Sequence, residues 1–498
     1  MLKASEGYGK IMSSVQSLLE GSGLKARVFR GGAWLGVGSV SEQSLRFLRN
    51  VTLARLLAPA EFGTMAIVMS VAGLLQAFTE IGVQDALIQN PRGSEPKYVN
   101  AVWWMALVRA LSVYSVLFAL APWVARFYTN PELTYLLRVA TLGILLEGAM
   151  SANSYVALKE MRLSRWAAIF HGGGILGVVT TVILGVLIRD VWALVIGACA
   201  ESAGRCVLSY IMCPYLPSLK VDRAAVRHLL KFSKGLFGLA PIRFIFTRAD
   251  MFVLGKLIPA AELGYYSLGI SVAQVPALFV LNLLSQIFFP ALSQIQDDKT
   301  RTARIVLQVT EVVVLLGMPA VVFAYFCGRP FLTLIYGRPY GVAAGPLVLA
   351  AGSALVNIIN GLVTCAIFAT GAPQLHRRCV AAMAVAMIIL IYPLARWLGP
   401  LGAQMASFIS ITVGFLLQLD RARYLIGIEL SEYAKIFIRE AAVSASLVLV
   451  YLVARPIMTM ARPLLTVGLG VFGCFVAYGF AGLILSRRPR FAHDNAVS

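Results

Sequence analysis

The stretch that decides the fold is Arg55-Leu56-Leu57-Ala58-Pro59-Ala60-Glu61-Phe62-Gly63, because a close copy of it occurs 201 residues later. That copy reads Lys256-Leu257-Ile258-Pro259-Ala260-Ala261-Glu262-Leu263-Gly264, and the same gapless shift places Ser70-Val71-Ala72 on Ser271-Val272-Ala273 and Phe78 on Phe279. Eight aligned positions are identical, and most of the others pair one apolar residue with another. Composition alone does not explain why both copies have a glutamate two residues before a glycine. The repeat indicates an internal duplication, which in a membrane protein predicts two lobes around a shared cavity.

The stretch before each copy carries charged residues on one helical face. In the first copy these are Glu42, Arg46 and Arg49, whose spacings of four and three place them on the same side of a helix. The shift aligns them with Arg243, Thr247 and Asp250. A charge at the centre of a membrane helix costs about 2.5–3.5 kcal/mol, so such residues seldom face lipid. We therefore expect both helices to turn a polar stripe toward water or substrate.

The composition is that of a polytopic membrane protein. Hydrophobic residues make up 59% of the 498 residues, charged residues make up 13%, and the mean hydropathy is +0.79. The net charge of +20 is explained by basic loops, so we expect no nucleic-acid partner. The seven cysteines form no Cys-x-x-Cys pair, and the four histidines have no metal-site spacing. We expect no metal and no cofactor. There is no phosphate-binding or nucleophile motif and no sizeable extramembrane loop, which argues against an enzyme.

Fourteen stretches are apolar and close to the roughly 20 residues that a bilayer core requires. They are 32–58, 62–89, 99–121, 133–158, 166–188, 190–213, 229–256, 263–292, 305–327, 341–369, 379–398, 400–420, 436–455 and 463–486. The fourth and tenth are the least regular, which leaves 12 or 13 spans open. About 26 Lys and Arg residues fall on one set of connections and about eight on the other. Because basic loops stay in the cytoplasm, this bias predicts an even number of spans and two cytoplasmic termini.

The predicted fold class is an all-α polytopic membrane protein of about 14 helices. Two pseudo-symmetric six-helix lobes would surround a central cavity, and two further helices would follow. In chain order we expect a basic cytoplasmic tail over 1–31, an N-lobe over 32–213, a cytoplasmic linker over 214–228, a C-lobe over 229–420, two extra helices over 421–486 and a cytoplasmic tail over 487–498. The linker contains two prolines and a cluster of basic residues, as expected of a connection between lobes.

Arginines concentrate in the two helices that carry the polar stripes. We predict that Arg46, Arg49, Arg243 and Arg248 line the cavity, where a planar guanidinium can donate paired hydrogen bonds to a diphosphate. Alanine at Arg46 or Arg243 should then abolish transport without changing the amount of inserted protein. Glu42 and Asp250 are candidates for coupling or gating, and Asp250 can either pair with Arg49 or hold a coupling cation. Structural roles are expected for the other polar residues of the spans, which include Glu80, Asp85, Arg109, Glu147, His171, Glu201, Arg205 and Glu311.

Two runs of sequence resemble a known family. Leu53 to Gly63, followed by Glu80-Ile81-Gly82-Val83-Gln84-Asp85-Ala86-Leu87-Ile88-Gln89, resembles the N-terminal signature of Wzx-type oligosaccharide flippases. In the second half, Tyr336-Gly337-Arg338 and Phe368-Ala369-Thr370-Gly371 are similar to the same family. The likeness covers roughly 32–420. These flippases belong to the polysaccharide transporter family of the multidrug/oligosaccharidyl-lipid/polysaccharide (MOP) exporter superfamily, and the colanic-acid-exporter-like branch is the most similar.

The resemblance implies a lipid-linked oligosaccharide flippase in the bacterial inner membrane. Its substrate would be an undecaprenyl-diphosphate-linked oligosaccharide, moved from the cytoplasmic to the periplasmic leaflet by alternating access. Membrane lipids, a coupling proton or sodium ion, a polysaccharide polymerase and a chain-length regulator are the further partners that it implies. Three alternatives stay open: a peptidoglycan-precursor flippase, a multidrug or cation antiporter of the same superfamily, and a membrane glycan polymerase or ligase.

Overall fold

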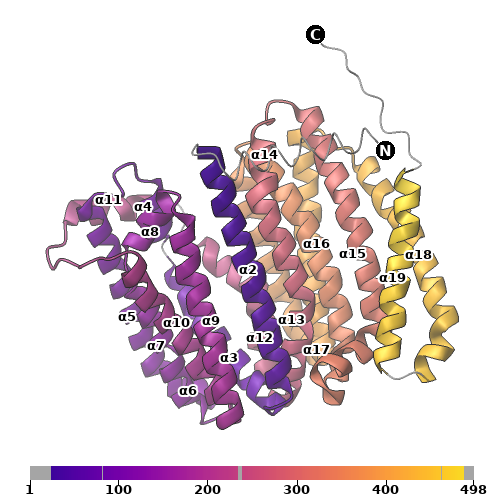
Figure 1. The fold of residues 1–498 in the computed structure, drawn as a ribbon, viewed down its shortest axis with the longest axis horizontal. Coiled ribbons are helices and arrows are strands. Elements are labelled where there is room, and N and C mark those ends of the chain that lie inside the picture. The colour runs from indigo at the N-terminus through magenta and orange to yellow at the C-terminus, as the bar shows by residue number, and fades with distance from the viewer. Residues whose placement is uncertain (1–23, 81, 234–237, 461–462, 487–498) are drawn as a thin grey trace. The chain divides into compact units, whose positions relative to one another are not determined.

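The computed structural model describes residues 24–80, 82–233, 238–460 and 463–486, and Figure 1 shows their helices. Contacts divide the chain into two compact units, residues 1–264 and 265–498, which are treated separately below as the N-terminal and C-terminal units. The predicted tail over 487–498 and most of the predicted tail over 1–31 lie outside the described residues.

The N-terminal unit consists of long spanning helices with short helices at their ends. Its elements are α2 (Leu24–Ala54), α3 (Pro59–Thr79), α4 (Val83–Gln89), α5 (Pro96–Phe127), α6 (Leu133–Ala140), α7 (Leu142–Gly148), α8 (Asn153–Lys159), α9 (Leu163–Leu187), α10 (Trp192–Met212), α11 (Arg223–Ser233) and α12 (Leu239–Leu257). Helix α9 packs against both α2 and α10, and α12 packs against α3. Helices α4, α8 and α11 gather at one end of the unit and α6 lies at the other (Figure 1).

Local sequence signals explain where several of these helices begin. Pro59 occupies the first turn of α3 after the extended residue Ala58, and Pro96 does the same for α5. Proline suits this position because its fixed φ is helical and its missing N–H would have no partner there. Gly82, with a φ of 59°, supplies the left-handed residue that separates α4 from the chain before it.

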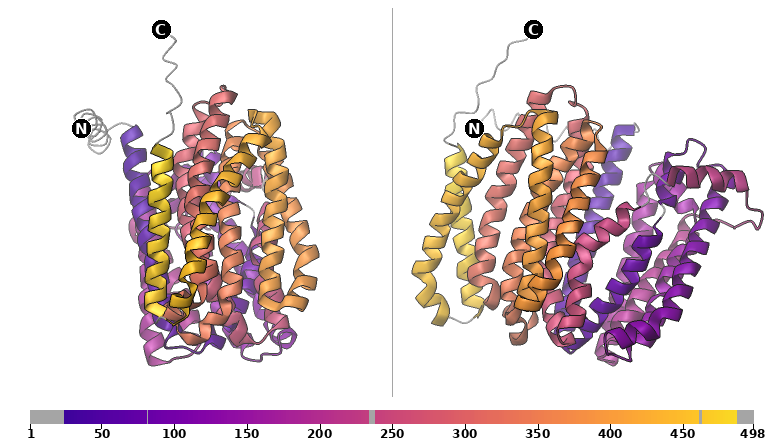
Figure 2. Two further views of the ribbon diagram at one scale, coloured as in Figure 1. Left: turned by 90° about the vertical axis from the view of Figure 1, so that its right-hand side faces the viewer. Right: turned by 180° about the vertical axis from the view of Figure 1, so that it is seen from behind.

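The C-terminal unit continues from α13 (Ala260–Leu283), whose first residues belong to the N-terminal unit. Its other elements are a π-helical turn η1 (Leu284–Phe288), α14 (Phe289–Ser293), α15 (Lys299–Tyr336), η2 (Arg338–Ala343), α16 (Ala344–Ala369), α17 (Pro373–Ile426), α18 (Leu430–Met460) and α19 (Pro463–Ser486). Figure 2 shows α18 and α19, in yellow at the end of the colour bar, side by side, and both helices pack on α15.

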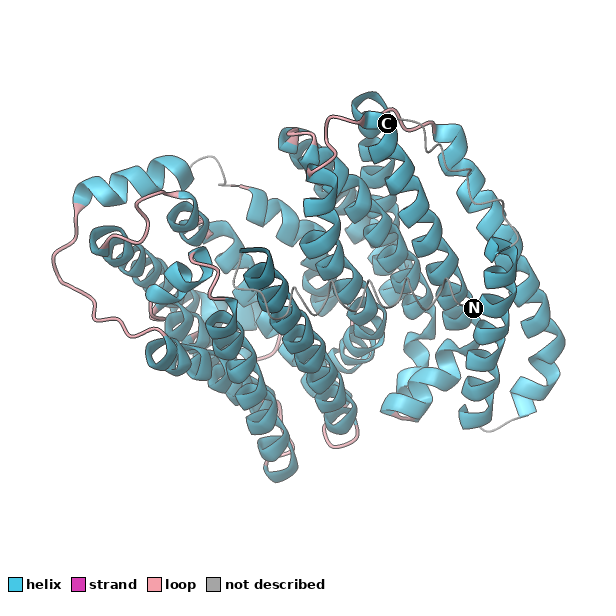
Figure 3. Ribbon diagram, turned by 45° about the horizontal axis from the view of Figure 1, so that its top comes forward, coloured by secondary structure: helices cyan, strands magenta, loops and turns pink. Residues whose placement is uncertain are grey.

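No strand occurs among the residues that the structure describes (Figure 3), so the predicted all-α polytopic fold is confirmed. Eight helices in the described ranges are long and apolar enough to cross a membrane, or nine if the bent group α6–α8 counts as one span. Helix α17 contains two predicted spans, because Gly399, with a φ of 57°, marks a kink between its halves. Helices α2 and α12 are not among these eight, because their charged stripes make them less apolar. The count of 14 stays a prediction.

Some predicted spans contain more than one helix. The stretch 133–158 is divided among α6, α7 and α8, and 229–256 covers the end of α11 and most of α12. Helix α11 begins inside the predicted linker 214–228 and packs against α4 and α5. The lobe and linker limits remain predictions.

Large apolar side chains cover much of the outer surface of both units. Leu187, Trp397, Ile438 and Val453 are each at least 70% exposed, and they represent many others on the spanning helices. Soluble proteins rarely expose continuous apolar areas of this kind. These surfaces are the lipid-facing sides of a multi-pass membrane protein.

The sequence repeat corresponds to a reciprocal contact at the start of α3 and of α13. A Cβ atom built on Gly63 would lie 1.8 Å from the carbonyl oxygen of Ala260, and one built on Gly264 would lie 1.8 Å from that of Pro59. Pro59 aligns with Ala260 and Gly63 with Gly264 under the same shift of 201 residues. Each glycine therefore contacts the backbone of the other copy at the equivalent place, as expected around a pseudo-twofold axis.

We expect Gly63→Ala and Gly264→Ala each to destabilise the protein by about 1–3 kcal/mol, because the added methyl group must displace a backbone carbonyl. The midpoint of thermal unfolding in detergent measures the effect. Gly328→Ala in α15 is the matched control, since its new Cβ would lie 3.5 Å from the nearest atom, an ordinary contact. Equal midpoints for Gly63→Ala and Gly328→Ala would contradict the close approach.

Candidate functional site

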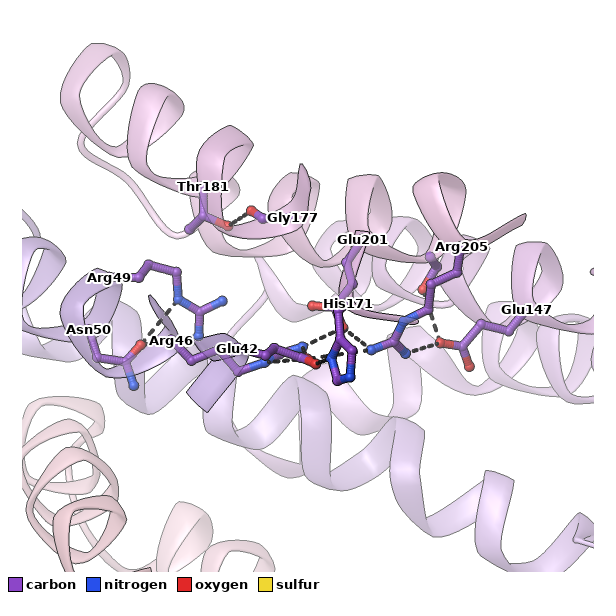
Figure 4. A network of polar contacts seen from close by, with 11 residues as sticks. Glu42, Arg46, Arg49, Asn50, Glu147, His171, Gly177, Thr181, Glu201 and Arg205 are labelled. Carbon is purple, nitrogen blue, oxygen red and sulfur yellow. Dashed lines mark hydrogen bonds and ion pairs between the residues drawn. The ribbon is translucent and has the colours of Figure 1, made fainter. Parts of the chain in front are cut away.

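The carboxylate of Glu42, on α2, is the first centre of a polar network inside the N-terminal unit (Figure 4). It accepts hydrogen bonds from Nε and Nη2 of Arg46 at 3.0 and 2.8 Å. Its second oxygen lies 2.7 Å from Nδ1 of His171 on α9. The Glu42 side chain is 14% exposed and that of His171 is 18% exposed, so this contact is largely removed from water.

Glu201, on α10, is the second centre. One of its oxygens accepts from Nη2 of Arg46 at 2.5 Å and also from Arg205 one helical turn later. Arg205 in turn reaches Glu147 on α7 at 3.3 Å, and Ser202 donates to the same Glu147 oxygen. Four helices are thus joined through alternating acids and bases, and Figure 4 shows the chain of contacts running from Glu42 to Glu147.

The charges in this network come close to balance. Three carboxylates face two guanidinium groups, and the imidazole of His171 lies beside the first carboxylate. Partly buried carboxylates of this kind are stable only while their partners stay in place, because an unpaired charge loses its hydration without compensation. Each charged member of the network therefore depends on its partner on another helix.

Glycines of α9 make room for these side chains. A Cβ atom on Gly174 would lie 2.9 Å from Oε1 of Glu42, and one on Gly177 would lie 2.5 Å from Cβ of Glu201. On the facing helix, a Cβ atom on Gly38 would lie 2.3 Å from the His171 ring. Any larger residue would push the charged groups away from the helix. These glycines allow the charged side chains to lie directly against the helix backbone.

The predicted site residues fall into two groups. Arg46 belongs to the network, and its guanidinium is already bonded to two acids. Arg49 lies one turn later and donates to the side chain of its neighbour Asn50 at 3.1 and 3.2 Å. The proposed pairing of Arg49 with Asp250 stays a prediction. Asp250 itself is buried, at 6% exposure.

Arg243 and Arg248, on α12, form the second group. Both side chains are exposed, and within the described ranges neither guanidinium has a hydrogen bond or an ion pair. Thr247, between them, donates to the backbone carbonyl of Arg243 at 2.9 Å and does not bond to either guanidinium group. Their donors are available to a ligand in a way that those of Arg46 are not.

Sequence reasoning did not identify Glu147, His171, Glu201 and Arg205 as members of one site. The four-residue spacing of Glu201 and Arg205 signals their ion pair, and the spacing of Glu42 and Arg46 signals another. The contacts between helices depend on how α9 is rotated about its own axis, which decides the helices that its glycines face. A single sequence carries no signal for that rotation.

The C-terminal unit has a smaller polar cluster around Gln418, which is fully buried. Its amide nitrogen donates to Oγ1 of Thr364 at 2.6 Å and to the Asn360 carbonyl at 3.2 Å, and its oxygen lies 3.1 Å from Nδ1 of His376. The cluster joins α16 to residues near both ends of α17, and helix packing explains it.

Known proteins that are similar to this chain are transport and polysaccharide-biosynthesis proteins. A succinoglycan biosynthesis transport protein of Rhizobium meliloti is 26% identical over 65% of this chain and 66% of its own length. The lipopolysaccharide biosynthesis protein WzxC of Escherichia coli is 22% identical over 79% of each chain. The match thus spans about two thirds of the first relative and four fifths of the second.

The fold is also found among solved structures. The lipid II flippase MurJ, in an inward-closed conformation, superposes with a TM-score of 0.72 over 91% of this chain and 99% of its own, at 14% identity. A family described as "Polysaccharide biosynthesis protein" matches residues 52–344, more than half of the sequence. That range contains both copies of the repeat. It also contains every member of the polar network except Glu42 and Arg46, which lie on α2. The chain belongs to this polysaccharide biosynthesis protein family.

Proposed function

We propose that the protein is a flippase for undecaprenyl-diphosphate-linked oligosaccharide, which it moves from the cytoplasmic to the periplasmic leaflet by alternating access. Support comes from relatives named as polysaccharide transport and biosynthesis proteins and from the likeness to a lipid flippase. The observation that carries the proposal is the pair of free arginines on α12. A membrane helix bears exposed guanidinium groups at a cost, and a diphosphate would offset that cost.

The four predicted arginines would act differently in this mechanism. Arg243 and Arg248 would bind the diphosphate directly, because their donors are unoccupied. Arg46 would contact substrate only by giving up one of its two carboxylates, so binding there would change the network. Arg49 remains a further candidate for acidic sugars.

Glu42 and Asp250 are the candidates for coupling transport to an ion or for gating. Glu42 and His171 form a carboxylate–imidazole contact of 2.7 Å between helices α2 and α9. We propose proton coupling at this pair, with Asp250 as the candidate for a gating role. Sodium would be the alternative ion, and transport driven by a sodium gradient at constant pH would favour it.

The direct test is transport by purified protein in liposomes. A fluorescent undecaprenyl-diphosphate-linked oligosaccharide is placed in one leaflet, and an impermeant quencher reports its arrival in the other. Protein-dependent transfer supports the proposal. Transfer of lipid II alone would indicate a peptidoglycan-precursor flippase, efflux of cationic dyes would indicate an antiporter, and lengthening of the glycan would indicate a polymerase.

We further propose that the protein resides in the inner membrane with both termini in the cytoplasm, beside a polysaccharide polymerase and a chain-length regulator. Contacts within the N-terminal unit support this topology. The Glu61 side chain lies beside the backbone N–H of Val191, so the turns before α3 and α10 share one end. Lys159 donates to the carbonyls of Asn90 and Pro91, so the turns before α5 and α9 share the other.

Reporter fusions test the topology. Fusions after Glu61, Asn130 and Arg189 are expected to be active in the periplasm, and fusions after Arg92, Arg162 and Arg301 in the cytoplasm, because the second set follows the basic connections. Cysteine labelling with an impermeant reagent at the same positions is an independent check. A periplasmic signal from the second set would reverse the assignment.

A further inference from the structure

The connection between α10 and α11, residues 213–222, is held in place by one buried amide. Asn100 on α5 donates to the carbonyls of Ser218 and Lys220, each at 3.0 Å. Its oxygen accepts from the Ser218 N–H at 2.9 Å and from the Tyr215 hydroxyl at 2.8 Å. A side-chain amide has two donor hydrogens and two acceptor lone pairs, so Asn100 uses its full capacity on this loop.

Two further contacts fix the same loop. Nε1 of Trp104 donates to the Ser218 carbonyl at 2.8 Å, and Nδ2 of Asn153 donates to the Pro214 carbonyl at 2.7 Å. The loop lies at the outer edge of the unit, on the side where it leads into α11 (Figures 1 and 3). Its backbone is therefore anchored while its tip projects outward.

The anchored loop presents two leucines to the outside. Leu216 is 92% exposed and Leu219 is 86% exposed, more than any other large apolar side chain in the described ranges. The hydrogen bonds to the loop backbone hold it in a position in which both leucine side chains are exposed. The loop also follows immediately after α10, a helix long and apolar enough to span the bilayer, so its tip lies near a membrane surface.

Basic residues follow the leucines in the chain. Lys220, Arg223, Arg227 and Lys231 are all exposed, and none of the four has an ion pair within the described part of the chain. The last three recur every four residues on one face of α11, while Ala225 and Leu229 on the opposite face pack against α4 and α5. Asp222, the only acid within residues 213–233, accepts from the Ala224 N–H at 2.8 Å and caps α11.

We propose that Leu216, Leu219, Lys220, Arg223, Arg227 and Lys231 form a leucine–basic patch that binds anionic phospholipid in the adjacent leaflet. The two leucines would enter the boundary between headgroups and acyl chains, and the four cations would hold lipid phosphates beside them. Combined apolar burial and charge attraction is the recognised basis of binding at membrane surfaces. Charge complementarity selects this occupant, because four unpaired cations at a bilayer surface match an anionic leaflet. The patch is separate from the charge network and does not depend on the proposed transport function.

An environment-sensitive fluorophore on Leu219→Cys tests the patch. The labelled protein is placed in nanodiscs of phosphatidylcholine alone and in nanodiscs that also contain phosphatidylglycerol, at low and high salt. We expect emission to rise about twofold or more with phosphatidylglycerol and the increase to shrink at high salt. Ser94→Cys is the matched control, because it is exposed in the loop before α5 at the same end of the unit. The unsubstituted protein gives the background from native cysteines.

A charge variant separates lipid recognition from folding. Arg223→Gln with Arg227→Gln and Lys231→Gln leaves the packing residues of α11 unchanged, so thermal unfolding in detergent should stay the same. The response to phosphatidylglycerol should be lost, which would support the proposal. Equal emission in both lipid mixtures from the labelled protein with its native charges, or a full response in the charge variant, would overturn anionic-lipid recognition. A rise that requires an added soluble protein would also overturn it and would identify the patch as a protein-docking surface.

Discussion

Replacement of Arg243 by alanine is expected to abolish glycan export while the amount of folded protein in the membrane stays close to normal. The Arg243 side chain is exposed and bonded to no protein group in the described ranges, so its removal strands no partner. Hydrogen bonds to charged groups are worth about 1.5–3 kcal/mol, which corresponds to roughly a 10- to 150-fold loss when one contact disappears. Export in a deletion strain and quantified membrane protein measure the two quantities.

Two variants control this experiment. Arg243→Lys should recover part of the activity, because the charge is kept and the paired donors of the guanidinium are lost. Arg126→Ala, at the exposed end of α5 outside the polar stripes, should export normally. Normal export by Arg243→Ala would show that this side chain does not bind the diphosphate.

Replacement of Arg46 by alanine is expected to lower stability as well as export. Arg46 is 25% exposed and lies between Glu42 and Glu201, which are 14% and 13% exposed. The alanine variant would leave two carboxylates short of their partner. Removal of one member of a buried ion pair typically costs about 3–5 kcal/mol, so the thermal midpoint should fall and less protein should accumulate.

A second substitution identifies the cause. Arg46→Ala combined with Glu201→Gln removes one of the stranded charges and should recover part of the lost stability, although export should stay low. A midpoint for Arg46→Ala equal to that of Arg243→Ala would contradict the network. Sequence alone predicts the same behaviour for these two arginines, and the contacts of Arg46 are the reason to separate them.

Much of the architecture follows from the amino-acid sequence because apolar length and the distribution of basic residues are strong physical signals. The duplication is readable from Glu61 and Glu262 and their glycines. The divisions within 133–158 and 229–256 are less readable. In the second stretch, Gly238, with a φ of 94°, precedes α12 inside a length of chain that fits one span. The ion pair of Arg46 with another helix is not readable from the sequence. Its partner Glu201 lies 155 residues away, and that pairing depends on helix rotation.

The reciprocal contact of Gly63 and Gly264 has an evolutionary consequence. After a duplication, two copies of a segment normally diverge, and here Phe62 already corresponds to Leu263. The two glycines cannot diverge in this way, because the space beside each one is filled by the backbone of the other copy. A larger residue in either copy would meet a carbonyl group that no side-chain change in the other copy can remove. At this point, two segments that can otherwise drift separately share a single steric constraint.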